Sequence, residues 1–251
     1  MDGPLLFLTV FLIACGAAFV QSMIGFGYSL LFAPIAALVL LPSDSVAISI
    51  VSGTAISVFL YVEHTPRAAL RSVAPMAVAA VLTAPAGLWL LVVADEEALH
   101  LLIGLAVLVS AVVNLRQGGH THVAKADRAS WQVAVGAVSG VMRGAVSLPG
   151  PPVILYQHWI GGGAAAIRSR MFVFFVWTGI PTVVIAALSG VFDADVWRYS
   201  LAAIPALPAG ILAGRVLRPR LPEPAFRWLS MALLAGTSAV AVAGSVVRMV
   251  G

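Results

Sequence analysis

The chain has 251 residues, of which 61% are hydrophobic and only 10% are charged. An ordinary soluble domain carries about 25% charged residues, so this composition excludes a fold whose surface faces water on all sides. The net charge of +4 does not indicate nucleic-acid binding, because the basic residues lie mostly between apolar segments, as in a membrane topology. A single cysteine, Cys15, excludes an intramolecular disulfide and a cysteine-based metal cluster.

Ten apolar segments are predicted, in two sets of five, which makes the chain an all-α polytopic membrane protein. Most are roughly 15–24 residues long, enough to cross or nearly cross a hydrocarbon core of ~30 Å. The segments are 4–22, 27–41, 45–62, 72–94 and 98–115 in the first set, and 131–147, 150–160, 170–190, 198–217 and 226–247 in the second. Segments 27–41 and 150–160 are short, so full spans and re-entrant elements both remain open for them.

The longest polar stretch, 116–130, divides the chain into a first transmembrane repeat (1–115) and a second (131–251). With ten alternating crossings and the N-terminus outside, most of the 14 Lys and Arg residues fall in inside loops, this linker included. We therefore expect a multi-pass protein of a bacterial inner (cell) membrane, with a cytoplasmic linker and with both termini outside.

The two halves resemble each other in the order of their small residues. Gly16 to Gly27 parallels Gly136 to Gly144, and Gly53 parallels Gly179. Since five segments per half is an odd number, the second half enters the membrane from the opposite side. This predicts a 5+5 inverted repeat, with alternating access to a midplane site between the halves.

Two glycine- and proline-rich interruptions fall at corresponding places, Gln21 to Ser29 and Gly140 to Pro152. Broken helices leave backbone N–H groups free at a positive helix end, which suits an anion. The alternative is that the glycines only let helices pack closely. Arg143, in the second interruption, is distant in sequence from other charges, and such arginines usually face a cavity or a partner. In the alternative interpretation, Arg143 lies at the end of its helix and its side chain extends to the lipid headgroups.

Substrate-binding residues are therefore predicted at and near these interruptions. They are Arg143, Gln21, Ser22, Gly25, Gly27, Ser52, Gly144, Ser147, Gly150, Thr178 and Trp177. Ser29, Ser49 and Ser57 are weaker candidates, since serines in membrane helices commonly bond their own backbone carbonyls. No cofactor and no metal site is predicted, because the His120 and His122 pair has no Cys or carboxylate cluster beside it.

Three short motifs stand out in the chain. They are GFG at Gly25 to Gly27, GPP at Gly150 to Pro152 followed by VILY, and the basic run Arg168 to Phe172. In these motifs the sequence resembles the TauE/SafE family of sulfite exporters. The resemblance spans about 5–247. It implies a secondary transporter that exports a small sulfur-containing anion such as sulfite, sulfoacetate or another organosulfonate, with that anion and the lipid bilayer as partners.

Four alternatives remain open. They are an anion channel, a proton-coupled transporter of a different anion, a membrane subunit that transports nothing, and a membrane-embedded enzyme. The enzyme is not expected, because the apolar segments show no nucleophile with a base and no paired carboxylates. An inside-negative potential drives a monovalent anion outward with about 2.3 kcal/mol per 100 mV, so export needs no coupled cation.

Overall fold

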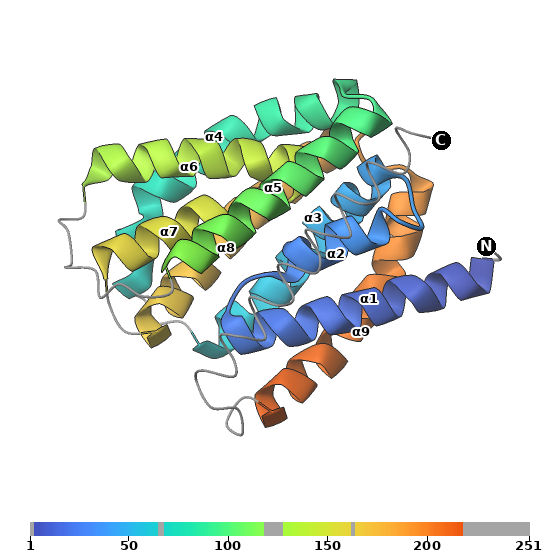
Figure 1. Cartoon of the computed structure of the whole chain (residues 1–251), viewed down its shortest axis with the longest axis horizontal. Helices are drawn as coiled ribbons and strands as arrows, with labels where there is room; N and C mark the ends of the chain where they lie inside the picture. Colours follow the sequence, from blue (N-terminus) through green and yellow to red (C-terminus); the bar gives the residue numbers. More distant parts are fainter. Residues whose placement is uncertain (1–2, 65–67, 118–127, 162–163, 218–251) are drawn as a thin grey trace.

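The computed structural model describes residues 3–64, 68–117, 128–161 and 164–217. Within these ranges the chain forms nine α-helices and no β-strand (Figure 1). The helices are α1 (Gly3–Ile24), α2 (Tyr28–Ala36), α3 (Pro42–His64), α4 (Ala68–Val93), α5 (Glu96–Gln117), α6 (Ala129–Val146), α7 (Gly150–Ile160), α8 (Ala164–Leu188) and α9 (Ala194–Leu217).

Each of the first nine predicted segments corresponds to one helix, with ends that differ by a few residues. The short segments 27–41 and 150–160 become α2 and α7, which are the two shortest helices described. The tenth segment, 226–247, lies outside the described residues, as does most of the predicted linker 116–130. The count of ten segments and the division into two repeats therefore stay predictions.

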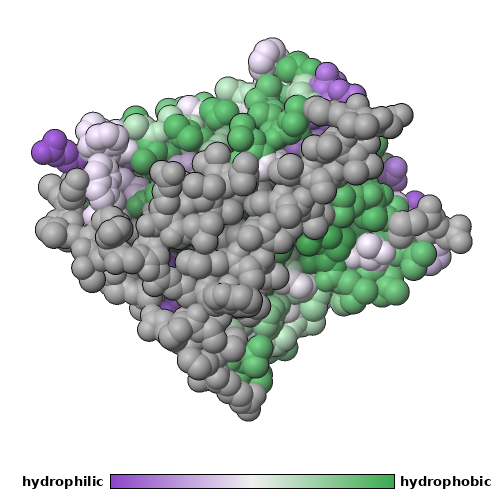
Figure 2. Space-filling model, in the orientation of Figure 1, coloured by the Kyte–Doolittle hydropathy of each residue, from purple (hydrophilic) through white to green (hydrophobic). Residues whose placement is uncertain are grey.

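Five of the described helices are long and apolar enough to cross a bilayer. These candidate spans are Gly3–Met23, Pro42–Val62, Arg71–Val93, Ala166–Leu188 and Ala194–Leu217. Figure 2 shows apolar side chains along the flank of the bundle, with hydrophilic ones gathered mainly toward its two ends. Leu82 and Leu188 are 74% and 84% exposed, a degree of apolar exposure that suits lipid better than water. The chain is thus a multi-pass helical membrane protein.

Helices α4 and α6 lie side by side at one edge of the bundle (Figure 1). A Cβ atom added at Gly136 would collide with the backbone of Met76, and one added at Gly140 would collide with Ala80. Since residue numbers rise together along both helices, α4 and α6 run parallel. Glycines at every fourth position let the two backbones approach this closely, as in membrane helix pairs generally.

Helices α1 and α9 form a similar pair at the opposite edge of the bundle (Figure 1). Gly210 lies against the backbone of Cys15, and Gly214 lies against Ser22, whose hydroxyl donates to the Ile211 carbonyl at 3.1 Å. Residue numbers again rise together, so α1 and α9 are also parallel.

Helices α3 and α8 connect these two pairs through the centre of the molecule. α3 packs on α8 and α9, and α8 packs on α3 and α4. At the crossing of α3 and α8, Gly179 leaves room for the side chain of Thr54. Thr54 Oγ1 donates to its own helix at the Ile50 carbonyl, 2.7 Å away, so the hydroxyl is satisfied inside an apolar core.

Candidate functional site

Two helix breaks of equal length meet at the centre of the bundle. Residues 25–27 separate α1 from α2, and residues 147–149 separate α6 from α7. Each break starts with a residue in the left-handed region, Gly25 at φ 94° and Ser147 at φ 57°. The Gly25 N–H donates to the Gln21 carbonyl at 2.7 Å, and the Ser147 N–H donates to the Arg143 carbonyl at 3.0 Å. Gln21 and Arg143 therefore hold the same position relative to their breaks.

Local sequence explains why both helices end there. Gly25 and a second positive-φ residue, Gly27 at 108°, adopt backbone conformations that L side chains rarely reach. In the other break, the rings of Pro151 and Pro152 provide no N–H, so α6 cannot continue into α7. Proline is tolerated in the first turn of α7, where the N–H has no helical acceptor.

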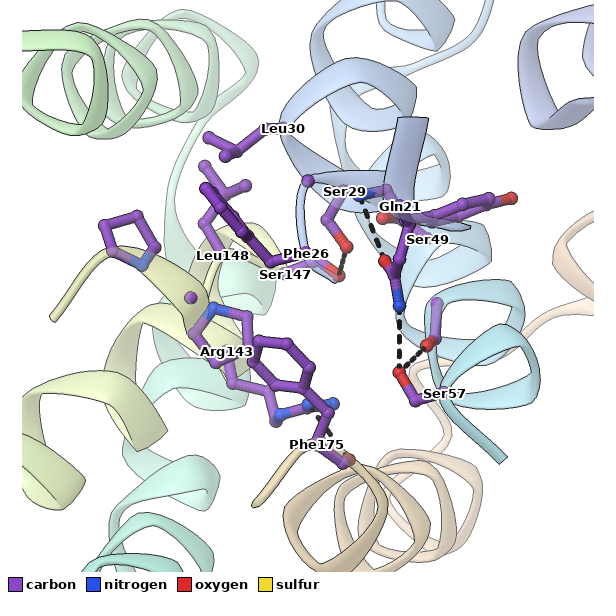
Figure 3. A pocket seen from close by; sticks show the side chains of 16 residues that line it. Gln21, Phe26, Ser29, Leu30, Ser49, Ser57, Arg143, Ser147, Leu148 and Phe175 are labelled. Atoms are coloured by element: carbon purple, nitrogen blue, oxygen red, sulfur yellow. Dashed lines mark hydrogen bonds between the residues drawn. The ribbon is translucent and has the colours of Figure 1, made fainter. Parts of the chain in front are cut away.

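A small cavity of about 30 Å³ lies between the breaks (Figure 3). Residues from α1, α2, α3, α6, α7 and α8 contribute to it. It is lined by Gln21, Phe26, Gly27, Tyr28, Ser29, Leu30, Ser49, Gly53, Ser57, Arg143, Ser147, Leu148, Pro149, Gly150, Pro151 and Phe175. Such a volume holds little more than a water-sized group, so the cavity as described is too small for a sulfite ion.

Arg143 brings a buried charge to this cavity. Its side chain is only 5% exposed, and its Nη2 donates to the Phe175 carbonyl of α8 at 3.2 Å. Its Nε has no acceptor, and within the described part of the chain no carboxylate pairs with the guanidinium. The alternative in which Arg143 extends to the headgroups does not fit this burial. A buried charge that lacks a counter-charge is costly, so an anion in the cavity would relieve a deficit already present.

Gln21 and four serines supply neutral hydrogen-bonding groups (Figure 3). The Gln21 amide is fixed at both ends, since its Oε1 accepts from the Tyr28 N–H at 3.1 Å and its Nε2 donates to Ser57 Oγ at 3.3 Å. Ser29 Oγ and Ser147 Oγ lie 3.3 Å apart and join the two breaks. Ser49 Oγ is buried and has no partner among the described residues, so it is available to a ligand.

The start of α2 adds backbone donors. Ser29 and Leu30 lie in its first turn, where helix geometry leaves N–H groups without an intrahelical acceptor. Both residues line the cavity, so the positive end of the helix faces it. The first turn of α7 can offer less, because Pro151 and Pro152 have no N–H. The first break thus provides backbone donors and the second provides the charge.

Residues 10–241 match the family described as sulfite exporter TauE/SafE, which is nearly the whole chain. The chain belongs to this family. TauE/SafE proteins are membrane transporters, so membership implies export of sulfite or a related anion. Neither the curated proteins nor the solved structures gave a significant match.

The cavity of this TauE/SafE protein brings together five of the residues predicted from sequence. They are Arg143, Gln21, Gly27, Ser147 and Gly150. The weaker candidates Ser29, Ser49 and Ser57 also line it. Phe26 and Phe175 were not predicted. The only available signals were the place of Phe26 inside the GFG motif and that of Phe175 one helical turn before Gly179.

The other six predicted residues lie outside the cavity lining. Ser22 bonds α9, and Gly144 packs on α4. Ser52 and Thr178 donate to the carbonyls four residues earlier in their own helices, at 2.6 and 2.7 Å. The remaining two are Gly25, which packs against the Arg168 side chain, and Trp177, which is 51% exposed on the outer face of α8.

Gly25→Ala is expected to destabilise the first break beyond the cost of its backbone conformation. A Cβ atom there would collide with Cγ of Arg168 and lie 2.8 Å from its Cδ. Gly190→Ala is the matched control, because Gly190 also has a positive φ, 72°, but no described part of the chain lies within 4 Å of its added Cβ. Both variants carry the left-handed penalty of about 1–2 kcal/mol. In thermal unfolding we expect Gly25→Ala to melt lower than Gly190→Ala; equal melting temperatures would show that Arg168 moves away freely.

Proposed function

We propose that this chain exports a small sulfur-containing anion, sulfite or an organosulfonate, through the cavity between the two helix breaks. The observation that carries the proposal is Arg143, a buried guanidinium with one carbonyl acceptor and no carboxylate partner among the described residues. A structural subunit has no reason to retain such a charge, since its burial costs free energy. In a transporter the buried guanidinium favours substrate binding, because the bound anion supplies the negative charge that balances Arg143.

The substrate oxygens are placed between two kinds of donor. On one side the Arg143 guanidinium presents its planar N–H groups, which match the oxygens of a sulfite or sulfonate group. On the other side stand the Ser29 and Leu30 N–H groups and the hydroxyl of Ser49. Phe26 and Phe175 flank the polar groups, so a short apolar substituent on the sulfur is tolerated.

The transport cycle is proposed to rest on a 5+5 inverted repeat. Two features support it: the parallel pairs α4 with α6 and α1 with α9 each join one half to the other, and Gln21 and Arg143 are equivalent relative to their breaks. When the two breaks are superimposed, Gln21 pairs with Arg143. This pairing is shifted by two residues from the sequence alignment that pairs Gly16 with Gly136. Because the cavity is too small for the substrate in the described structure, binding is proposed to require movement of one half against the other.

Export is proposed to follow the membrane potential. The acidic residues of the described helices lie in first or last turns, such as Asp44, Glu96, Glu97 and Asp195. No carboxylate therefore stands in the middle of a described helix to carry a proton. An inside-negative potential supplies about 2.3 kcal/mol per charge per 100 mV. With both termini outside a bacterial inner membrane, as proposed, the basic loops face the cytoplasm.

Gln21→Glu is expected to abolish anion transport while leaving the shape of the cavity nearly unchanged. The carboxylate can still accept from the Tyr28 N–H, but it places a negative charge in the cavity that holds Arg143. That charge repels the substrate and competes with it for the guanidinium. We expect a fall of about 100-fold in the rate of sulfite efflux, or about 2.7 kcal/mol.

Gln21→Met separates the charge from the lost hydrogen bonds. Methionine has a similar length, and it removes both amide contacts without adding charge. Both bonds join protein groups and neither is made to the substrate, so we expect a smaller fall in the efflux rate than in Gln21→Glu, about tenfold. If Gln21→Met and Gln21→Glu were equally impaired, the electrostatic role of the cavity would be refuted and a positioning role would replace it.

Counterflow distinguishes a carrier from a channel. Proteoliposomes loaded with unlabelled sulfite are diluted into a trace of radiolabelled sulfite at zero potential. A carrier with alternating access exchanges the two, so we expect transient accumulation of label above its equilibrium level. Simple equilibration without overshoot would support the channel. A proton gradient imposed in the same vesicles tests the proton-coupled alternative, and we expect it to leave the flux unchanged.

A further inference from the structure

A second cavity lies apart from the transport site, in a groove between α4 and α8. It has a volume of about 360 Å³. Its lining is apolar except for one arginine, and consists of Arg71, Val73, Ala74, Ala77, Val78, Val81, Leu82, Val173, Trp177 and Pro181. None of these residues lines the cavity that contains Arg143. Nothing in the proposed transport function therefore uses the groove.

The groove follows one leaflet of the bilayer. Arg71 lies in the first turn of α4, at the start of the candidate span Arg71–Val93. From Arg71 to Leu82 the helix rises about 16 Å, half of a hydrocarbon core of ~30 Å. Leu82 and Val78 are largely exposed. The groove thus runs from headgroup level to the bilayer centre, which is the path of one acyl chain.

Among the described residues that line the groove, Arg71 is the single charged group, and it lies at the headgroup end. The Arg71 side chain is exposed, and it makes no hydrogen bond or ion pair with the residues that the structure describes. A guanidinium binds phosphate oxygens through paired N–H groups. In a zwitterionic lipid, the headgroup's own cation lies close to the phosphate and partly neutralises it. In an anionic lipid, the negative charge of the phosphate is available to the guanidinium of Arg71.

We propose that the groove between α4 and α8 is a binding site for one anionic glycerophospholipid. An acyl chain lies along Ala74, Val78 and Leu82 of α4 and against Trp177 and Pro181 of α8, and the phosphate pairs with Arg71. The opposite side of α8 carries Phe175, the acceptor of Arg143. The lipid therefore packs on the helix that also borders the transport cavity.

Native mass spectrometry tests this site without any transport measurement. The full-length protein in detergent is mixed with equal amounts of phosphatidylglycerol and phosphatidylcholine that share the same acyl chains. We expect the wild type to retain phosphatidylglycerol at least about fivefold more than phosphatidylcholine, on the scale of one charge-assisted contact. Arg71→Gln is expected to lose that preference. Arg198→Gln is the control, because Arg198 is another exposed cation, whose Cζ lies 5.0 Å from the centre of the Phe7 ring in a different helix pair.

Ala74→Phe tests the groove itself. Ala74 is exposed, so a larger side chain fills the groove without entering the core. We expect this variant to retain neither lipid, at an unchanged melting temperature. An unaltered preference in Arg71→Gln would overturn the proposal. So would a dimer in the wild type that Ala74→Phe dissociates, since the groove would then hold a second copy of the chain.

Discussion

Arg143→Gln is expected to abolish saturable sulfite efflux from proteoliposomes without lowering the melting temperature. The substitution removes the buried charge that a bound anion balances, and a fall of at least about 100-fold corresponds to about 2.7 kcal/mol of lost stabilisation. Stability is expected to stay equal or to rise, because the guanidinium is buried with one carbonyl acceptor in the described structure. Removing an uncompensated buried charge relieves its desolvation cost. Loss of transport together with undiminished stability identifies a functional charge.

Two further substitutions make this result specific. Ser139→Ala removes another buried polar group of α6, whose Oγ has no partner among the described residues and which lies outside the cavity; we expect wild-type efflux. Arg143→Lys keeps the positive charge but loses the paired N–H donors of the planar guanidinium. We expect its rate of sulfite efflux to lie between those of the wild type and Arg143→Gln. Wild-type efflux in Arg143→Gln would remove Arg143 from the site, and an equal loss in Ser139→Ala would indicate general damage to α6.

Gly140→Ala is expected to cause the largest loss of stability among single-methyl additions. The added Cβ would collide with the Ala80 carbonyl and with Thr83 Oγ1, which donates to the Ala137 carbonyl of α6 at 2.8 Å. Two backbones cannot yield as a flexible side chain can, so the helices must separate. Overpacking of this kind costs about 1–3 kcal/mol. We expect a lower melting temperature by size-exclusion thermal scanning.

Gly16→Ala is the matched control for this loss. Gly16 also lies inside a membrane helix, and its added Cβ has no neighbour within 4 Å among the residues that the structure describes. Both substitutions gain the helix preference of alanine over glycine, about 0.5–1 kcal/mol, so the difference between them reports the contact alone. If both variants were equally stable or both were stabilised, the close contact of α4 and α6 would be refuted.

The positions of the helices could be predicted from sequence because hydropathy and Pro–Gly punctuation determine them locally. Nine predicted segments match nine described helices, and the two short ones are α2 and α7. The side-chain environment could not be predicted in the same way. Ser52 and Thr178 are alike in sequence and both face their own helix backbone, because a hydroxyl in an apolar segment is satisfied most easily there.

The cavity could be predicted where the backbone itself is unusual, and much less well elsewhere. Gly27, Ser147 and Gly150 stand at the breaks, so glycine and proline reveal them. Phe175 lies in a continuous apolar run, and only the crossing of α3 with α8 brings it to the cavity. Trp177 is predicted from sequence to bind substrate, but it is 51% exposed on the outer face of α8 and does not line the cavity. Phe175 and Trp177 are two residues apart, about half a turn of α8, and sequence spacing alone does not show which of them faces the cavity.

The most direct test of the central proposal is sulfite efflux from proteoliposomes of the wild-type protein under an imposed potential. The anion cavity predicts efflux that saturates with internal sulfite and that accelerates when the interior is made negative. The expected gain in driving force is about 2.3 kcal/mol per 100 mV for each charge moved. Folded protein that gave no efflux of sulfite or of small sulfonates, or a flux indifferent to the potential, would contradict potential-driven export of a sulfur-containing anion.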